Sequence, residues 1–265
     1  MQEELLHIFP LHLRETLQKV TMKENTLEEI RIRIGQPVIF HMENEEWYLK
    51  KETGRLERSQ VNAYCATKED IKSMVKFISS YSLYAYEDEM KRGFITMQGG
   101  HRIGVAGQVV MDGGKVLSLS NIYFLNIRVA REKRGCAKDI IPYLIHRNNI
   151  YNTLFVSPPG IGKTTYLRDA IRILSNGSDR LHGMKISIID ERSEIAACRQ
   201  GIPQNDIGIR SDVLDGCLKS FGMLLMLRSM APQIIAVDEI GSREDCRAME
   251  QAIYSGSRII GTVHA

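Results

Sequence analysis

Apolar runs that end in polar residues recur through the second half of the chain. Residues 154–156, 184–190, 234–237 and 258–264 have the composition of buried strands. Residues 167–174 repeat apolar side chains at helical spacing until Asn176-Gly177 stops the pattern. Strands and helices that alternate in this way are typical of an α/β domain built on an open parallel sheet.

The first half has a different pattern, in which short helices precede alternating strands. Residues 4–20 predict two short helices separated at Pro10, and Thr67 opens a helix with a buried stripe of Ile71, Met74, Val75 and Ile78. Strands are predicted at 28–34, 38–40, 47–49, 93–97, 102–110, 116–119 and 124–130, with a hairpin turn at 112–114. This half is therefore expected to be an α+β domain over residues 1–135.

The charged run 131–135 marks the predicted boundary with a second domain over residues 136–265. A helix at 138–147, with Ile140, Ile141, Leu144 and Ile145 buried, is expected to lead into that domain. The tyrosines Tyr81, Tyr84 and Tyr86 favour packing over a base-stacking platform, because no basic run accompanies them. His101 and Arg102, in a glycine-rich turn, fit a solvated turn better than a contact with a neighbouring molecule.

Composition narrows the choice of function only slightly. The net charge of +3 is too small to indicate nucleic acid binding, so no nucleic acid partner is expected. The five cysteines, Cys65, Cys136, Cys198, Cys217 and Cys246, are scattered and predict small core residues in a reducing compartment. No secretory signal and no transmembrane segment are expected from the apolar runs.

The segment after the strand at 154–156 has the pattern of a phosphate-binding loop. Gly160 and Gly162 allow backbone N–H groups to curl around a polyphosphate. Lys163 is placed to reach the β and γ phosphates, and Thr164 to offer its hydroxyl to Mg²⁺ at the start of a helix. The usual pattern has glycine where this chain has Ser157, so some strain is expected there. The predicted nucleotide-binding residues are Ser157, Pro158, Pro159, Gly160, Ile161, Gly162, Lys163, Thr164 and Thr165.

The strand at 234–237 is followed by two acids with separate predicted roles. Asp238 is expected to hold Mg²⁺ through its water shell, together with Thr164. Glu239 is expected to orient and deprotonate the attacking water, as a hydrolase requires. The pairing of a phosphate-binding loop with this acid pair predicts a nucleotide hydrolase.

Other charged residues leave alternatives open. Asp190 ends a strand where it is able to reach the nucleotide, but it fits equally well as a helix cap before Ile195. His264 fits either a sensor of the γ phosphate or a structural histidine. Four arginines are candidates for stabilising charge in the transition state: Arg192, Arg210, Arg228 and Arg243.

Several stretches resemble the stage III sporulation protein AA family of endospore-forming bacteria. In the second half they are residues 189–196 (IDERSEIA), 200–210 (QGIPQNDIGIR), 227–230 (LRSM) and 237–241 (VDEIG). In the first half they are residues 29–33 (EIRIR) and 99–104 (GGHRIG). The likeness extends over most of the chain.

The resemblance implies a P-loop NTPase with a RecA-like α/β core and an N-terminal α+β domain, related to the ATPases of type II and type IV secretion and of pili. Asp190, Glu191 and Glu194 match the aspartate box of those ATPases and His264 matches their histidine box. The predicted catalytic residues are therefore Glu239, Lys163, Glu194 and His264, with ATP and Mg²⁺ as cofactors.

The same resemblance implies partners and a location. The full-length protein is expected to form a homohexamer at the mother-cell cytoplasmic face of the membrane around the forespore. There it would power or assemble a channel complex with membrane-embedded subunits. The family continues beyond the residue matching Ala265, so the core is expected to be truncated at its C-terminus.

Two other functions are also compatible with the sequence. One is an AAA-type ATPase that acts on single-stranded nucleic acid, although no added binding module is visible. The other is a scaffold that binds ATP without turnover, which Ser157 and the truncated end favour.

Overall fold

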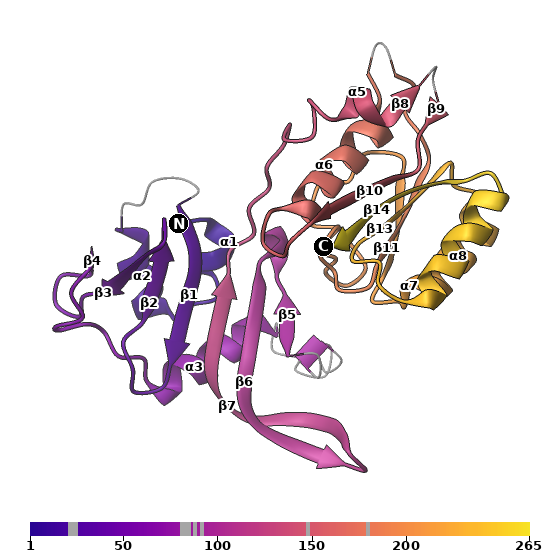
Figure 1. The fold of residues 1–265 in the computed structure, drawn as a ribbon. Helices are drawn as coiled ribbons and strands as arrows, with labels where there is room; N and C mark the ends of the chain where they lie inside the picture. The colour runs from indigo at the N-terminus through magenta and orange to yellow at the C-terminus, as the bar shows by residue number, and fades with distance from the viewer. Residues whose placement is uncertain (21–25, 80–85, 87–88, 91–92, 147–148, 179–180) are drawn as a thin grey trace. The chain divides into compact units, whose positions relative to one another are not determined.

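The computed structural model describes residues 1–265 apart from 21–25, 80–85, 87–88, 91–92, 147–148 and 179–180 (Figure 1). The chain forms two compact units, Met1–Arg131 and Glu132–Ala265. This division lies at the start of the charged run 131–135, whereas the boundary predicted from the sequence lies at its end. In the described part of the chain, no helix combines the length and apolar composition needed to cross a bilayer.

The first unit is an antiparallel sheet of seven strands with helices on one face. The strand order is β4-β3-β2-β1-β7-β6-β5. The strands are β1 (Leu27–Arg33), β2 (Ile39–Met42), β3 (Glu45–Leu49), β4 (Leu56–Glu57), β5 (Phe94–Thr96), β6 (Arg102–Asp112) and β7 (Lys115–Arg128). The helices are α1 (Glu3–Leu6), α2 (Leu11–Gln18) and α3 (Lys68–Ile78), followed by a short 3₁₀ turn at Gln98–Gly100.

Alternation along the strands separates a buried face from a solvent face. Ile30 and Ile32 of β1 are fully buried and pack with apolar residues of α1, α2 and α3 in one core. Helix α3 begins, as predicted, at Thr67, whose side chain accepts a hydrogen bond from the amide of Asp70 in a capping box. The residues between the buried ones, including Arg31 and Arg33, lie on the other face of the sheet.

Strands β6 and β7 continue past the rest of the sheet as a two-stranded ribbon (Figure 1). The sequence predicted two strands over the second arm, but β7 is continuous from Lys115 to Arg128. The pairing shifts register on either side of Gly107. A Cβ atom at Gly107 would lie 2.6 Å from the carbonyl oxygen of Asn121, so the strands approach this closely only with glycine there.

Three expectations for the first unit need correction or fall outside the description. His101 is buried rather than solvated, because its Nδ1 accepts a hydrogen bond from the amide of Ala130 at 3.0 Å. Tyr86 is buried as expected, whereas Tyr81 and Tyr84 lie outside the described residues. The prediction that all five cysteines are core residues is wrong, because Cys65 is exposed.

In the second unit, Cys198 is buried, Cys246 is exposed, and Cys136 and Cys217 are partly exposed.

The second unit is a parallel sheet of five strands in the order β10-β14-β13-β11-β12. The strands are β10 (Thr153–Ser157), β11 (Ile186–Asp190), β12 (Ser211–Asp215), β13 (Ile234–Val237) and β14 (Arg258–His264). The long helices are α6 (Lys163–Asn176), α7 (Lys219–Met230) and α8 (Arg243–Tyr254).

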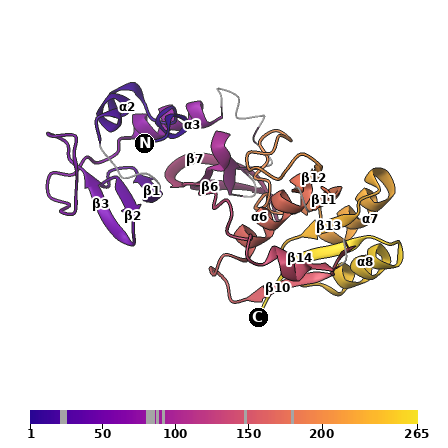
Figure 2. The same cartoon turned by 90° about the horizontal axis from the view of Figure 1, so that it is seen from above.

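Both faces of this sheet are covered by helices (Figures 1 and 2). On one face, Leu167 and Ile171 of α6 pack against alternate strand residues such as Ile188. On the other face, α7 and α8 pack against the intervening strand residues, among them Ile189 and Ile235. The continuous apolar runs in the sequence therefore reflect strands that are buried on both sides.

The predicted helix at 138–147 is wrong. Among the described residues 138–146, only Ile141–Leu144 (α5) is helical, and it is followed by a small hairpin of β8 (Ile145–His146) and β9 (Asn149–Ile150). Pro142 provides no amide for a helical hydrogen bond, and Ile145 pairs with Ile150 instead of continuing the helix. Tertiary pairing here prevails over the apolar spacing.

Candidate nucleotide-binding site

The candidate site is built at one edge of the parallel sheet of the second unit. Parallel strands bring their carboxyl ends to the same edge, and ligands of open α/β sheets bind there. Ser157 ends β10 and lies beside His264, which ends β14. Asp238 and Glu239 follow β13, which pairs with β14 and β11. Residues far apart in the sequence therefore meet at this edge.

The loop between β10 and α6 owes its conformation to its glycines. Gly160 and Gly162 have φ of 79° and 98°, in the left-handed region that disfavours other residues. A Cβ at either position would meet no atom within 4 Å, so the requirement for glycine is one of backbone conformation. The strain expected at Ser157 is not found, because Ser157 is the last residue of strand β10 and does not have a positive φ.

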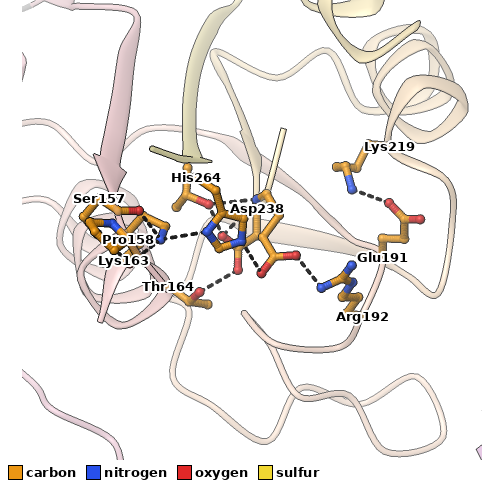
Figure 3. A network of polar contacts seen from close by, with 11 residues as sticks. Ser157, Pro158, Lys163, Thr164, Glu191, Arg192, Lys219, Asp238 and His264 are labelled. Carbon is orange, nitrogen blue, oxygen red and sulfur yellow. Dashed lines mark hydrogen bonds and ion pairs between the residues drawn. The ribbon is translucent and has the colours of Figure 1, made fainter. Parts of the chain in front are cut away.

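Lys163 lies at the first position of α6 and closes the loop (Figure 3). Its Nζ donates hydrogen bonds to the carbonyl oxygens of Ser157 at 2.7 Å and Pro158 at 2.9 Å. It also lies 3.1 Å from Nδ1 of His264. An ammonium group has three donors and no acceptor, so all three donors are engaged and Nδ1 of His264 must accept.

This contact determines the tautomer of His264. Because Nδ1 accepts from Lys163, the proton of the neutral ring lies on Nε2, which is 3.0 Å from Oε1 of Glu239. His264 therefore donates to Glu239 and joins it to the lysine of the loop. The structure brings these three predicted residues together.

Asp238 is held by two threonine hydroxyl groups. Thr164 Oγ1 donates to Oδ2 of Asp238 at 2.7 Å, so the two predicted metal residues are in direct contact (Figure 3). The hydroxyl of Thr262 donates to Oδ1. Thr262 is fully buried on β14 and also accepts a hydrogen bond from the amide of Glu239 at 2.8 Å.

Sequence reasoning did not find Thr262. In the sequence it is one more β-branched residue in a strand, two positions before His264. Its role follows from the pairing of β14 with β13, which the sequence pattern does not reveal.

Glu239 has a left-handed backbone conformation, with φ of 50°. Its amide donates a hydrogen bond to the hydroxyl oxygen of Thr262, and its carboxylate contacts His264 through Oε1 and Arg192 through Oε2. Such a backbone conformation is rare for residues other than glycine and persists only where surrounding contacts hold it. The site therefore holds this carboxylate from both its backbone and its side chain.

Asp190 ends β11 and is tied to the loop that follows it. It is buried, and its carboxylate accepts hydrogen bonds from the amides of Glu194, Ile195 and Ala196 at 2.7–3.0 Å. Burial raises its pKa even though these three amides oppose the shift. Residues 191–200, all of which the structure describes, form turns rather than a helix, so the helix-cap interpretation is wrong. Asp190 shapes the loop that carries Glu194.

The loop after Asp190 faces the acids of β13. A small pocket is lined by Asp190, Glu191, Arg192, Glu194, Lys219, Asp238 and Glu239. Glu194 thus shares a pocket with Asp238 and Glu239, while Glu191 forms an ion pair with Lys219 of α7. Arg168 of α6 supports this loop by donating from Nε to the carbonyl oxygen of Ile195 at 2.8 Å.

Among the four candidate arginines, the structure places Arg192 against Glu239. Arg210 instead donates to the carbonyl oxygens of Ser175 at 2.9 Å and Asn176 at 3.2 Å, at the end of α6. Arg228 lines a cavity beside the first residues of β13 and β14, at the opposite edge of the sheet. Arg243 is the first residue of α8.

Solved structures with a similar fold are ATPases and a motor. The pilus retraction motor PilT with bound ADP has a TM-score of 0.62 and 16% identity, with 100% of this chain and 68% of that chain covered. The Legionella pneumophila ATPase DotB has a TM-score of 0.54 and 15% identity, and this chain spans 63% of it. The chain therefore has the α/β fold of a P-loop NTPase, with a RecA-like core and an N-terminal α+β unit, as expected from the sequence.

Similarity in sequence extends over nearly the whole chain. Stage III sporulation protein AA of Bacillus subtilis (strain 168) is 40% identical over 262 residues, which are 98% of this chain and 81% of that protein. The uncharacterized protein ycf45 of Cyanidium caldarium is 33% identical over 147 residues, which are 55% of this chain and 42% of that protein. Residues 1–265 match the family described as "Sporulation stage III, protein AA", and the chain belongs to that family.

Proposed function

We propose that this protein is an Mg²⁺-dependent ATPase that powers or assembles a channel complex between mother cell and forespore. The observation that carries the proposal is the direct contact between Thr164 of the loop and Asp238 of β13, at 2.7 Å. It joins the two halves of a nucleotide site that lie 74 residues apart. Membership of a sporulation family and a fold shared with a pilus motor support the cellular role.

Residues 157–165 would bind ATP. The amides of the loop and the start of α6 suit an anion, and Lys163 supplies the positive charge. Because all three donors of Lys163 are engaged, a phosphate oxygen must replace at least one of their present acceptors. If the phosphate oxygen takes the place of His264 Nδ1, the link that His264 forms between Lys163 and Glu239 is broken.

The residues at Asp238 fit Mg²⁺. Thr164 and Asp238 offer hard oxygen donors side by side, which is the donor type that Mg²⁺ prefers. Among the described residues, no group of three or more His, Cys, Asp or Glu side chains is arranged to hold a metal. Binding would therefore depend on these two residues and on the phosphates. When bound, the ion supplies charge stabilisation for phosphoryl transfer.

Glu239 is proposed as the general base. Its carboxylate accepts hydrogen bonds from Nε2 of His264 and from the guanidinium of Arg192, so it is held in position for a water molecule. Glu194 lines the same pocket and is proposed to assist there. His264 is the positioning group that connects Glu239 to the lysine of the loop.

The working form is proposed to be a homohexamer of the full-length protein. We further propose that it acts with membrane-embedded channel subunits at the mother-cell cytoplasmic face of the forespore membrane, without a nucleic acid partner. The family and the fold shared with DotB and PilT support this proposal.

Two substitutions test the proposed activity. Lys163→Ala should abolish ATP binding, and Glu239→Gln should retain binding while release of phosphate from ATP stops. Glu244→Gln, at an exposed carboxylate on α8, is the matched control and should hydrolyse ATP normally. If Glu239→Gln hydrolyses ATP at the parent rate, Glu239 is not the base. If none of the proteins releases phosphate with Mg²⁺ present, the ATPase proposal is wrong.

The cellular role has a separate test. In a spore-forming host, replacement of the native copy by the Glu239→Gln form should lower the yield of heat-resistant spores. The Glu244→Gln form should support normal yields. Equal yields from both forms would contradict a role for hydrolysis in sporulation.

A further inference from the structure

A second group of polar residues lies on the first unit, on the face of its sheet opposite the helices. The motif at 29–33 alternates, so that Ile30 and Ile32 are buried while Arg31 and Arg33 lie on the outer face. The proposed ATPase function makes no use of these arginines.

Strand pairing gathers residues from three strands around them. Arg31 lies opposite Asn126 of β7, which lies opposite Gly104 of β6. Arg33 lies opposite Phe124, which lies opposite Ala106. A pocket of about 340 Å³ is lined by Arg31, Arg33, Gly93, Gly104, Val105, Ala106, Phe124, Leu125 and Asn126.

Two polar atoms of this pocket have no partner in the described structure. Nε of Arg33 and Oδ1 of Asn126 are both buried and make no hydrogen bond. A buried polar group without a partner costs about 1–3 kcal/mol, and more if it is charged. One unpartnered donor and one unpartnered acceptor in the same pocket indicate a ligand that both accepts and donates hydrogen bonds.

The charge of the pocket is positive. Glu29 neighbours it and pairs with Arg31, and it also interacts with the side chain of Asn126. Burial alone would raise the pKa of Glu29, but these hydrogen bonds and the charges of Arg31 and His41 lower it, so Glu29 stays ionised. This carboxylate pairs with Arg31, whereas Arg33 forms no ion pair with a described residue.

The walls of the pocket leave room for an organic group. Gly93 and Gly104 have no side chains, and the ring of Phe124 is 46% exposed beside them. Pockets for small molecules typically measure about 300–1,000 Å³, and this one lies near the lower limit. Its size suits a small molecule, and its aromatic rim suits apolar contact.

We infer that this pocket binds a small molecule that carries a phosphate group and a hydroxyl group. Guanidinium groups match phosphate oxygens in geometry and charge, and Arg31 and Arg33 supply two of them. The unpartnered oxygen of Asn126 would accept a hydrogen bond from the hydroxyl or from a protonated phosphate. A simple carboxylate offers fewer oxygens and, when ionised, no donor. The pocket is lined by residues of the first unit and shares none with the P-loop.

The test uses the whole chain carrying Lys163→Ala, which removes nucleotide binding at the P-loop. Glycerol 3-phosphate and inorganic phosphate are titrated by calorimetry, and glycerate serves as the carboxylate counterpart of glycerol 3-phosphate. We expect glycerol 3-phosphate to bind at least about tenfold more tightly than glycerate, and to bind more weakly as salt is added.

Substitutions locate the site. Arg33→Gln and Arg31→Gln should each weaken binding of glycerol 3-phosphate by about tenfold or more, as expected for loss of a charge-assisted contact. Arg55→Gln removes the same charge from an exposed position on the same unit and should bind normally. Because Arg31 is exposed, its replacement tests the site even if Arg33→Gln does not fold. Equal binding by Arg31→Gln and Arg55→Gln, or no binding of either phosphate probe, overturns the inference.

Discussion

Thr262→Val is the most informative single change in the candidate site. Valine has nearly the shape of threonine, so it retains the packing of β14 while removing the hydroxyl that joins Asp238 to the amide of Glu239. A hydrogen bond to a charged group contributes about 1.5–3 kcal/mol. The amide of Glu239 is also 3.1 Å from Oδ1 of Asp238, so it does not lose every acceptor. We therefore expect the free energy of unfolding to fall by about 2–3 kcal/mol.

The effect on ATP hydrolysis should be larger than the effect on ATP binding. Without Thr262, the left-handed conformation of Glu239 loses its main backbone contact, whereas Lys163 and its loop are unchanged. A displacement of the base by about 1 Å costs roughly a hundredfold in rate. We expect kcat to fall by about that factor while KM for ATP changes little.

The assay is steady-state phosphate release with Mg²⁺, together with urea unfolding. Thr262→Ser is the matched control, because it retains the hydroxyl and loses one buried methyl group, at a cost of about 1 kcal/mol. It should keep most of the activity. Wild-type turnover by Thr262→Val would refute the reasoning, and equal losses in the two variants would show that packing, rather than the hydroxyl, matters.

Three further predictions concern backbone and charge. Gly162→Ala should weaken ATP binding and lower the free energy of unfolding by about 1–2 kcal/mol, because φ is 98° at Gly162. Gly256→Ala is the control: φ is 92° there, at the other edge of the sheet, so the loss of stability should be similar while ATP binding stays normal. Gly107→Ala should lower the melting temperature, because its Cβ would lie 2.6 Å from a carbonyl oxygen and overpacking costs about 1–3 kcal/mol. Burial would raise the pKa of Asp245, but hydrogen bonds from Ser242 and Gly241 lower it below 3.8, so its stabilising effect is complete above pH 3.8 and is lost as the pH falls through the lowered value. Asp245→Asn should remove this acid dependence, measured by urea unfolding at pH 7 and pH 3; an unchanged dependence would contradict the assignment.

Features that depend on neighbouring residues were predictable from the amino-acid sequence. The conformation of the phosphate-binding loop depends on a few adjacent residues, because Gly160 and Gly162 permit a backbone conformation that is unfavourable for other residues. The strand before it and the acids after β13 are also local patterns. The helix cap at Thr67 follows from its own neighbours in the same way. These features were predictable because their causes lie within a few positions along the chain.

Tertiary structure decided how these pieces meet. The order β14-β13-β11 places Thr262 beside Asp238 and Arg192 beside Glu239, and neither contact has a signature in the spacing of the residues. Asp190 holds a loop in place because folding brings three amides within hydrogen-bonding distance of its carboxylate. The pocket at Arg33 likewise exists only through the register of β1 with β7. Pairing between distant strands depends on the whole hydrophobic core, so a pattern of adjacent residues does not specify it.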